Sequence, residues 1–173
     1  MSQVLWPDGY APAEASVYVV NTRTVVASPG EVWVWLARPE CWPRFYANAR
    51  WIRHLSGPWP HLEVGSRFRW FTFGTVVTSV VTECQPPARL AWTWRGIGAR
   101  GHHGWVIVPG RDGCRISTEE TVQGTLPRLL HRLVRPVMAY YHQRWLDGLA
   151  DISDPQGALA RDRSRPQRHS AAP

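Results

Sequence analysis

Apolar and polar residues alternate along most of the central part of the chain, and this pattern predicts β-strands. In residues 66–73, the polar side chains of Arg67 and Arg69 alternate with the aromatic side chains of Phe68 and Trp70. A period of two is that of a strand with one buried face. Similar runs bounded by glycine and proline predict six further strands, at residues 17–26, 50–55, 76–83, 89–95, 103–108 and 114–122.

The connections within the central run of six strands are short, which indicates an antiparallel sheet. Residues 109–113, Pro-Gly-Arg-Asp-Gly, have the composition of a hairpin turn, and Gly74 permits a tight turn between two strands. Gly96, Gly98 and Gly101 predict a bend before the strand that begins at His103. Tight turns of this kind can join antiparallel strands, whereas parallel strands need a long crossover connection.

The pattern changes to a helical one near the end of the chain, at residues 126–152. Thr125 is the expected N-cap, and Pro127 lies in the first turn, where its missing N–H costs nothing. Pro136 predicts a kink or a break near Leu133. Apolar residues at three- and four-residue spacing predict one apolar stripe: Leu130, Val134, Val137, Met138, Tyr141, Trp145 and Leu149.

Two short helices are expected between the first and second strands. Ser28, Pro29 and Glu31 suit the N-cap, first and third positions of a helix that Pro39 ends. A second helical segment is predicted at 40–47. The fold class is therefore α+β: a curved antiparallel sheet of about seven strands around a long C-terminal helix. One domain is expected at 16–153, with an N-terminal extension at 1–15 and a disordered tail at 154–173.

Composition excludes several classes of protein. The 20 basic residues are all arginine, several lie in the predicted tail, and the net charge of +7 is therefore weak evidence for nucleic-acid binding. The three cysteines lack the spacing of a zinc site or a disulfide framework. We expect no metal, no cofactor, no membrane span and no signal peptide, and therefore a cytoplasmic protein. We also expect a monomer or a homodimer.

Five short motifs, in their order along the chain, resemble those of the START-like superfamily, also called SRPBCC or helix-grip proteins, in its polyketide cyclase/dehydrase branch. The motifs are Ser-Pro-Gly-Glu-Val-Trp at 28–33, Pro-Glu-Cys-Trp-Pro at 39–43, Pro-Pro-Ala-Arg-Leu-Ala-Trp at 86–92, Trp-Val-Ile-Val-Pro at 105–109, and Glu120 four residues before Gly124. The resemblance implies a central apolar cavity between sheet and helix. It also implies a cavity arginine in the aromatase/cyclases, but residues 76–83 contain none.

Strand alternation, together with the helix stripe and the Trp-Pro motif, predicts which side chains face that cavity. For residues 76–83 the pattern does not decide between the set with Val76 and the set with Val77. Ordinary core packing is the alternative role for most of the candidates. The candidate ligand-binding residues are Trp42, Phe68, Trp70, Trp92, Trp94, Trp105, Thr118, Met138, His142 and Trp145.

Three residues are candidates for catalysis. Glu120 could act as a general acid or base, or be a structural acid held by Arg95 at the cavity rim. His103 could transfer protons or lie in a solvated loop, and Tyr141 could donate a hydrogen bond to a ligand. The resemblance to the polyketide cyclase/dehydrase branch implies a cofactor-independent polyketide cyclase or dehydratase of secondary metabolism that binds a hydrophobic, aromatic small molecule. A non-catalytic carrier of such a molecule is the alternative.

Overall fold

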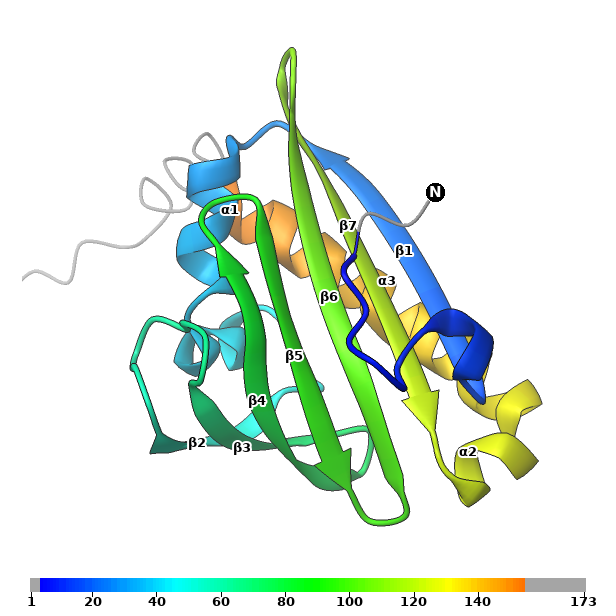
Figure 1. Cartoon of the computed structure of the whole chain (residues 1–173). Coiled ribbons are helices and arrows are strands. Elements are labelled where there is room, and N and C mark those ends of the chain that lie inside the picture. Colours follow the sequence, from blue (N-terminus) through cyan, green and yellow to red (C-terminus); the bar gives the residue numbers. More distant parts are fainter. Residues whose placement is uncertain (1–3, 155–173) are drawn as a thin grey trace, which may run out of the picture.

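The structure, a computed structural model, describes residues 4–154 and consists of one seven-stranded antiparallel sheet with the long C-terminal helix on one face. The strand order is β1-β7-β6-β5-β4-β3-β2, so the first and last strands of the chain are neighbours. In Figure 1 the long helix α3 lies behind the sheet. The strands are β1 (Val17–Val25), β2 (Arg50–Ser56), β3 (Arg67–Thr72), β4 (Thr75–Gln85), β5 (Arg89–Gly96), β6 (Ala99–Gly110) and β7 (Gly113–Gln123).

All seven predicted strands are present, but β6 begins at Ala99 and includes residues that we expected in a bend. Gly101 and Gly104 both lie inside the strand at places with no room for a side chain. At Gly101 a Cβ would be 2.4 Å from the Thr121 carbonyl oxygen and 2.6 Å from the indole ring of Trp94. At Gly104 a Cβ would be 2.5 Å from the side chain of Val4. These two glycines therefore allow close packing on the two faces of a strand and do not end it.

The segment between β1 and β2 forms α1 (Pro29–Leu36) and the 3₁₀-helix η2 (Pro39–Arg44). The predicted start of α1 is confirmed, because Ser28 Oγ accepts from the Glu31 N–H and Glu31 Oε2 accepts from the Ser28 N–H at 2.7 Å. The second helical segment, predicted at 40–47, is shorter than predicted and has 3₁₀ geometry.

The C-terminal helical segment is divided into α2 (Thr125–Leu129) and α3 (His131–Ser153). The break lies at Leu130, earlier than predicted, and Pro136 is accommodated within α3. Thr125 is the first residue of α2 rather than its N-cap, which is Gly124. None of the helices within 4–154 is long and apolar enough to cross a membrane.

Aromatic side chains fill the middle of the space between the sheet and α3. The Trp42 indole lies at the centre, 5.4 Å from Trp92 and 5.0 Å from Trp145 between ring centroids, and its N–H donates to the Leu36 carbonyl oxygen at 3.0 Å. On β4 the buried set is the one that contains Val77, which settles the facing of that strand. Toward one end of the helix–sheet interface this packing gives way to a pocket.

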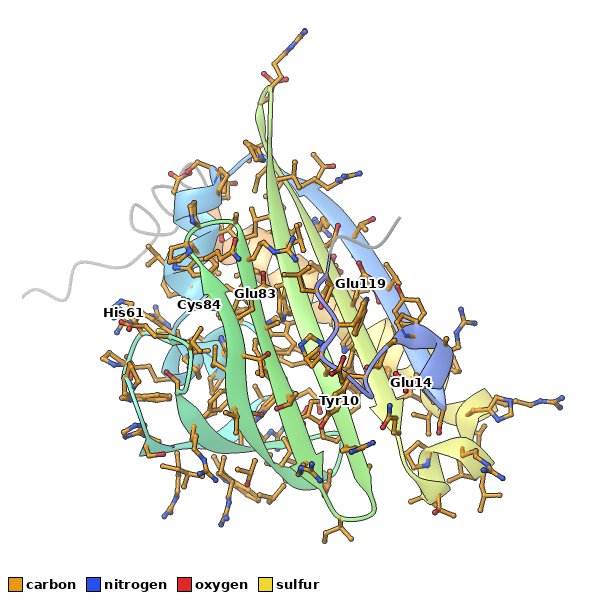
Figure 2. All side chains as sticks on the ribbon, viewed as in Figure 1. Tyr10, Glu14, His61, Glu83, Cys84 and Glu119 are labelled. Atoms are coloured by element: carbon orange, nitrogen blue, oxygen red, sulfur yellow. The ribbon has the colours of Figure 1, made fainter. Side chains whose placement is uncertain are left out.

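The N-terminal segment before β1 packs on the other face of the sheet and includes the 3₁₀-helix η1 (Pro12–Glu14) (Figures 1 and 2). Val4 is buried, and the rings of Trp6 and Tyr10 lie against His102 of β6. Thr121 Oγ1 donates to the Tyr10 carbonyl oxygen at 2.9 Å. Of the predicted C-terminal tail, 154–173, all but Asp154 lies outside the described residues.

Candidate functional site

A pocket of about 670 Å³ lies between the sheet and the helices α2 and α3. Residues of the β3–β4 turn, the β5–β6 turn and α2 line it, so it extends to one end of the sheet, whereas the predicted cavity was central. No arginine of the described residues lines it, in agreement with the absence of the family's cavity arginine from β4. Its walls are mostly apolar and include Trp70, Val77, Trp94, Val122, Met138 and Trp145.

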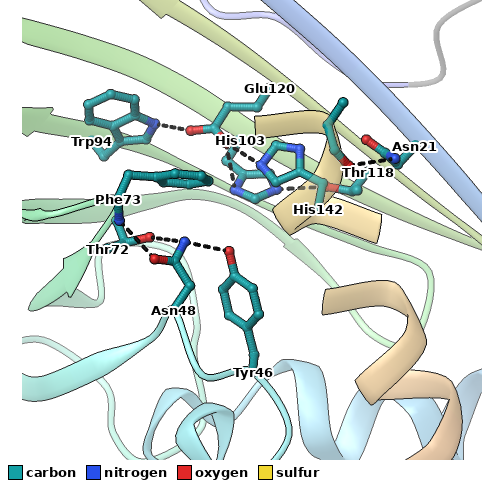
Figure 3. A network of polar contacts seen from close by, with 11 residues as sticks. Asn21, Tyr46, Asn48, Thr72, Phe73, Trp94, His103, Thr118, Glu120 and His142 are labelled. Carbon is teal, nitrogen blue, oxygen red and sulfur yellow. Dashed lines mark hydrogen bonds and ion pairs between the residues drawn. The ribbon is translucent and has the colours of Figure 1, made fainter. Parts of the chain in front are cut away.

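A buried carboxylate and two buried imidazoles lie together at the wall of this pocket. Glu120, His103 and His142 are 5%, 2% and 1% exposed. Glu120 Oε2 is 2.7 Å from His142 Nε2 and 3.5 Å from His103 Nδ1 (Figure 3). The two imidazole centroids are 4.9 Å apart. We call these three residues the His-Glu-His cluster.

The β6–β7 hairpin and the docking of α3 explain this arrangement. His103 and Glu120 are directly paired across the two strands, seven residues before Gly110 and seven after Gly113. Paired residues point to the same face of a sheet, with Cβ atoms about 5 Å apart. His142 comes from α3, four residues after the buried Met138, and therefore lies on the same helix face.

Two further hydrogen bonds hold the cluster. The indole N–H of Trp94 donates to Glu120 Oε1 at 2.6 Å. On the other side, His103 Nε2 is 2.6 Å from the hydroxyl oxygen of Thr118, which precedes Glu120 by two residues on β7. Gly101 makes room for the Trp94 ring, so the glycine on β6 contributes to the position of the carboxylate.

Burial and the neighbouring groups have opposite effects on the charges of the cluster. Burial lowers the pKa of His103 to about 3, although the Glu120 charge opposes this change. Burial raises the pKa of Glu120, but the adjacent imidazoles and the Trp94 N–H outweigh it, so that its pKa is lowered overall. Glu120 is therefore an ionised carboxylate deep in an apolar pocket at neutral pH.

A second polar network lies across the pocket from the cluster (Figure 3). Asn48 donates to the Tyr46 hydroxyl at 2.8 Å and to Thr72 Oγ1 at 3.1 Å, and accepts from the Phe73 backbone N–H at 3.0 Å. Phe73 has a positive φ of 47°, which costs energy for a residue with a side chain. Its ring packs edge-on against Tyr141 of α3, and it thereby closes one side of the pocket.

The structure separates the predicted site residues into two groups. The three catalytic candidates, Glu120, His103 and Tyr141, all line the pocket, Tyr141 as a partly exposed residue of its rim. Of the ligand-binding candidates, the residues that line it are Trp70, Trp94, Met138, His142 and Trp145. The others, Trp42, Phe68, Trp92, Trp105 and Thr118, are packed in the interior beside it.

The structure also decides between the alternatives that the sequence left open for single residues. His103 is in a strand rather than a solvated loop, and His142, a ligand-binding candidate, is buried on α3. Glu120 contacts imidazoles and an indole and is not held by Arg95, which is exposed. Sequence reasoning missed Asn48 and Phe73, which also line the pocket; the tight turn at Gly74 was a signal for the adjacent Phe73 and not for Asn48.

Comparison with known proteins agrees with this geometry. Residues 16–153 match the model of the family described as polyketide cyclase / dehydrase and lipid transport. The chain belongs to this family. The resemblance seen in the motifs is thus confirmed. No curated protein matches the chain.

Several solved structures share the fold of this family member. A hypothetical protein of Helicobacter pylori, jhp0584, is 27% identical, with a TM-score of 0.80 over 89% of this chain and 98% of its own. CalU16 of Micromonospora echinospora is 17% identical, with a TM-score of 0.56 over 84% and 82% of the two chains. DynU16, from the dynemicin biosynthetic locus, is 19% identical, with a TM-score of 0.58 over 77% of this chain and 45% of its own.

Proposed function

We propose that this protein binds a hydrophobic, aromatic or polyketide-like small molecule in the pocket and acts on it as a cyclase or dehydratase of secondary metabolism. The observation that carries the proposal is the His-Glu-His cluster, an ionised carboxylate and two imidazoles at the wall of a mostly apolar pocket. Such a combination of apolar walls and a few convergent polar groups is typical of small-molecule sites.

The size and the mouth of the pocket support binding of an apolar molecule. A volume of about 670 Å³ is in the range of about 300–1,000 Å³ for drug-sized ligands. Leu126, Leu130 and Leu133 line the pocket while 60%, 41% and 67% exposed, so its entrance is apolar. DynU16, of similar fold, comes from the biosynthetic locus of a natural product, which supports secondary metabolism.

The chemistry of cyclisation and dehydration requires transfer of a proton next to a carbonyl group. In our proposal the Glu120 carboxylate removes this proton and later returns it to the product, while the N–H of a neighbouring neutral imidazole donates a hydrogen bond to the developing oxygen. Among residues 4–154 the buried Trp145 indole N–H has no hydrogen-bond partner, and it could donate to a ligand oxygen. Tyr141 at the rim would orient the far end of the ligand.

Ligand carriage without catalysis is the second candidate. It is favoured by the hydrogen bond that already occupies Glu120 Oε1, because a carboxylate held in this way can be purely structural.

Under both candidates the protein works in the cytoplasm, and the free thiols of Cys41, Cys84 and Cys114 are compatible with a reducing compartment.

Binding can be tested with 1,8-dihydroxyanthraquinone as an aromatic, polyketide-like probe. Titration should change tryptophan fluorescence and raise the thermal midpoint by mass action. Val77→Phe would fill part of the pocket and weaken binding at least tenfold. Val76→Phe, at the adjacent exposed position on the opposite face, should bind like the parent. Equal affinities of the two variants would place the probe elsewhere and contradict the proposed site.

Proton transfer can be tested separately with 2-tetralone, a small aromatic ketone with exchangeable hydrogens beside its carbonyl group. In D₂O the protein should accelerate exchange of these hydrogens, as followed by NMR. Glu120→Gln should abolish the acceleration, whereas Glu119→Gln, the neighbour facing the other side, should retain it. If the ketone binds and the parent protein gives no acceleration over buffer, the carrier function replaces the enzymatic one.

A further inference from the structure

The His-Glu-His cluster has a second possible occupant besides an organic ligand. We propose that His103, Glu120 and His142 form a binding site for one divalent ion of the first transition series, such as Zn²⁺, Fe²⁺ or Co²⁺. This inference goes beyond the proposed function, which needs only the metal-free pocket. It differs from the expectation drawn from sequence, because the three ligands come from three separate elements and have no diagnostic spacing.

The spacing of the ligand atoms suits a single ion. Within residues 4–154 this is the one group of His, Cys, Asp or Glu residues whose candidate ligand atoms all lie within 4.8 Å of one another. Atoms bound at about 2.0–2.2 Å to one ion lie about 2.9–3.5 Å apart in octahedral or tetrahedral geometry. The carboxylate oxygen is 2.7 Å from one imidazole nitrogen and 3.5 Å from the other. The carboxylate oxygen is thus already near the required distance from both imidazoles, and the two imidazole nitrogens, within 4.8 Å of each other, would move closer together around the ion.

The direction of the contacts also favours an ion over a hydrogen bond. His142 Nε2 is 2.7 Å from Glu120 Oε2, yet it is not aligned as a donor, and neither ring nitrogen of His142 has a hydrogen-bond partner among the described residues. A buried imidazole nitrogen that makes no hydrogen bond is costly, even with a carboxylate oxygen close by. An ion placed between the imidazole and the carboxylate would provide Nε2 with a partner and neutralise the buried charge.

The atoms that would not bind the ion are already held by other groups, as is usual around metal ligands. His103 Nε2 lies 2.6 Å from Thr118 Oγ1, and when Nε2–H donates to this oxygen, Nδ1 keeps the lone pair that metal binding requires. Glu120 Oε1 accepts from the Trp94 N–H, which leaves Oε2 for the ion. All three ligands are rigidly placed by burial.

The pocket supplies the remaining coordination positions. All three residues line it, so that an ion bound to them would face the space in which we place the organic ligand. Two histidines and one carboxylate are a donor set typical of non-haem iron and of catalytic zinc, where open positions accept water or substrate. With an ion bound, Glu120 would serve as one of its ligands, and the ion would supply a Lewis acid to a ligand oxygen in the pocket.

Metal binding is tested on the full-length chain without an affinity tag, treated with EDTA and then freed of it. We expect one equivalent of Co²⁺ per chain, seen as visible absorption, and one equivalent of Zn²⁺ by calorimetry. His103→Ala and His142→Ala should each weaken binding of this equivalent at least tenfold, and Thr118→Val about tenfold. His102→Ala is the matched control and should bind normally, because this adjacent histidine lies on the opposite face of the sheet.

The parent protein alone provides an independent check if a variant fails to fold. X-ray absorption of the zinc-loaded protein should show two imidazoles and at least one oxygen ligand, and zinc should raise its thermal midpoint. Absence of a first equivalent, other donors, or equal affinity in the His142→Ala and parent proteins would overturn the proposal. Anthraquinone binding by the metal-free protein tests the pocket separately, so that failure of one proposal is distinguished from failure of the other.

Discussion

The hydrogen bond between Trp94 and Glu120 gives the most quantitative prediction. The indole N–H donates to Glu120 Oε1 at 2.6 Å, and the carboxylate is only 5% exposed. Trp94→Phe keeps an aromatic ring at this position but removes the donor. Glu120→Leu removes the acceptor and keeps a side chain of comparable size.

The expected magnitude follows from the charge and burial of the acceptor. A hydrogen bond to a charged group contributes about 1.5–3 kcal/mol to the free energy of unfolding. Each single variant also changes packing or leaves other groups unpaired, and these effects cancel in a double-mutant cycle. The double variant Trp94→Phe/Glu120→Leu should therefore be more stable than the sum of the single effects predicts, by about 1.5–3 kcal/mol.

Urea unfolding at neutral pH, followed by far-UV circular dichroism, measures all four proteins of the cycle. EDTA is present throughout, so that a bound metal ion does not contribute. Trp35→Phe is the control, because this half-buried indole packs between Phe45 and the Arg44 guanidinium. Its effect should add to that of Glu120→Leu within about 0.5 kcal/mol. A coupling for Trp94 no larger than that for Trp35 would refute the hydrogen bond as a stabilising contact.

Three further predictions concern β6. Gly101→Ala should destabilise the protein by about 1–3 kcal/mol or more in thermal unfolding, because its Cβ would overlap the Trp94 ring; an unchanged midpoint contradicts this packing. Gly104→Ala should displace Val4 and make the N-terminal segment sensitive to proteolysis, and truncation of that segment should remove the difference from the parent. Burial lowers the pKa of His102 from 6.5 to about 4, so unfolding takes up a proton between these two pH values. The contribution of neutral His102 to the free energy of unfolding is therefore full above pH 6.5 and declines toward pH 4 by about 1.4 kcal/mol per pH unit. His102→Gln should flatten this decline, as measured by urea unfolding.

The sequence by itself determined the elements and most of their faces. Period-two alternation identified seven strands, and the Ser28 capping box identified the start of α1, because both signals are local. The turn at 109–113 also determines that His103 pairs with Glu120, because a two-residue turn sets the register of the hairpin. That pair could therefore have been predicted from sequence alone.

Only the tertiary structure decided where packing ends and the pocket begins. Alternation places Trp92 and Trp94 on the same face, but whether a side chain meets the aromatic core or open space depends on where α3 crosses the sheet. The break at Leu130 orients the start of α3 over the pocket, and local propensity had indicated a later position. His142 joins His103 and Glu120 only through this docking, because contacts between distant elements depend on how they pack and not on their spacing in the chain.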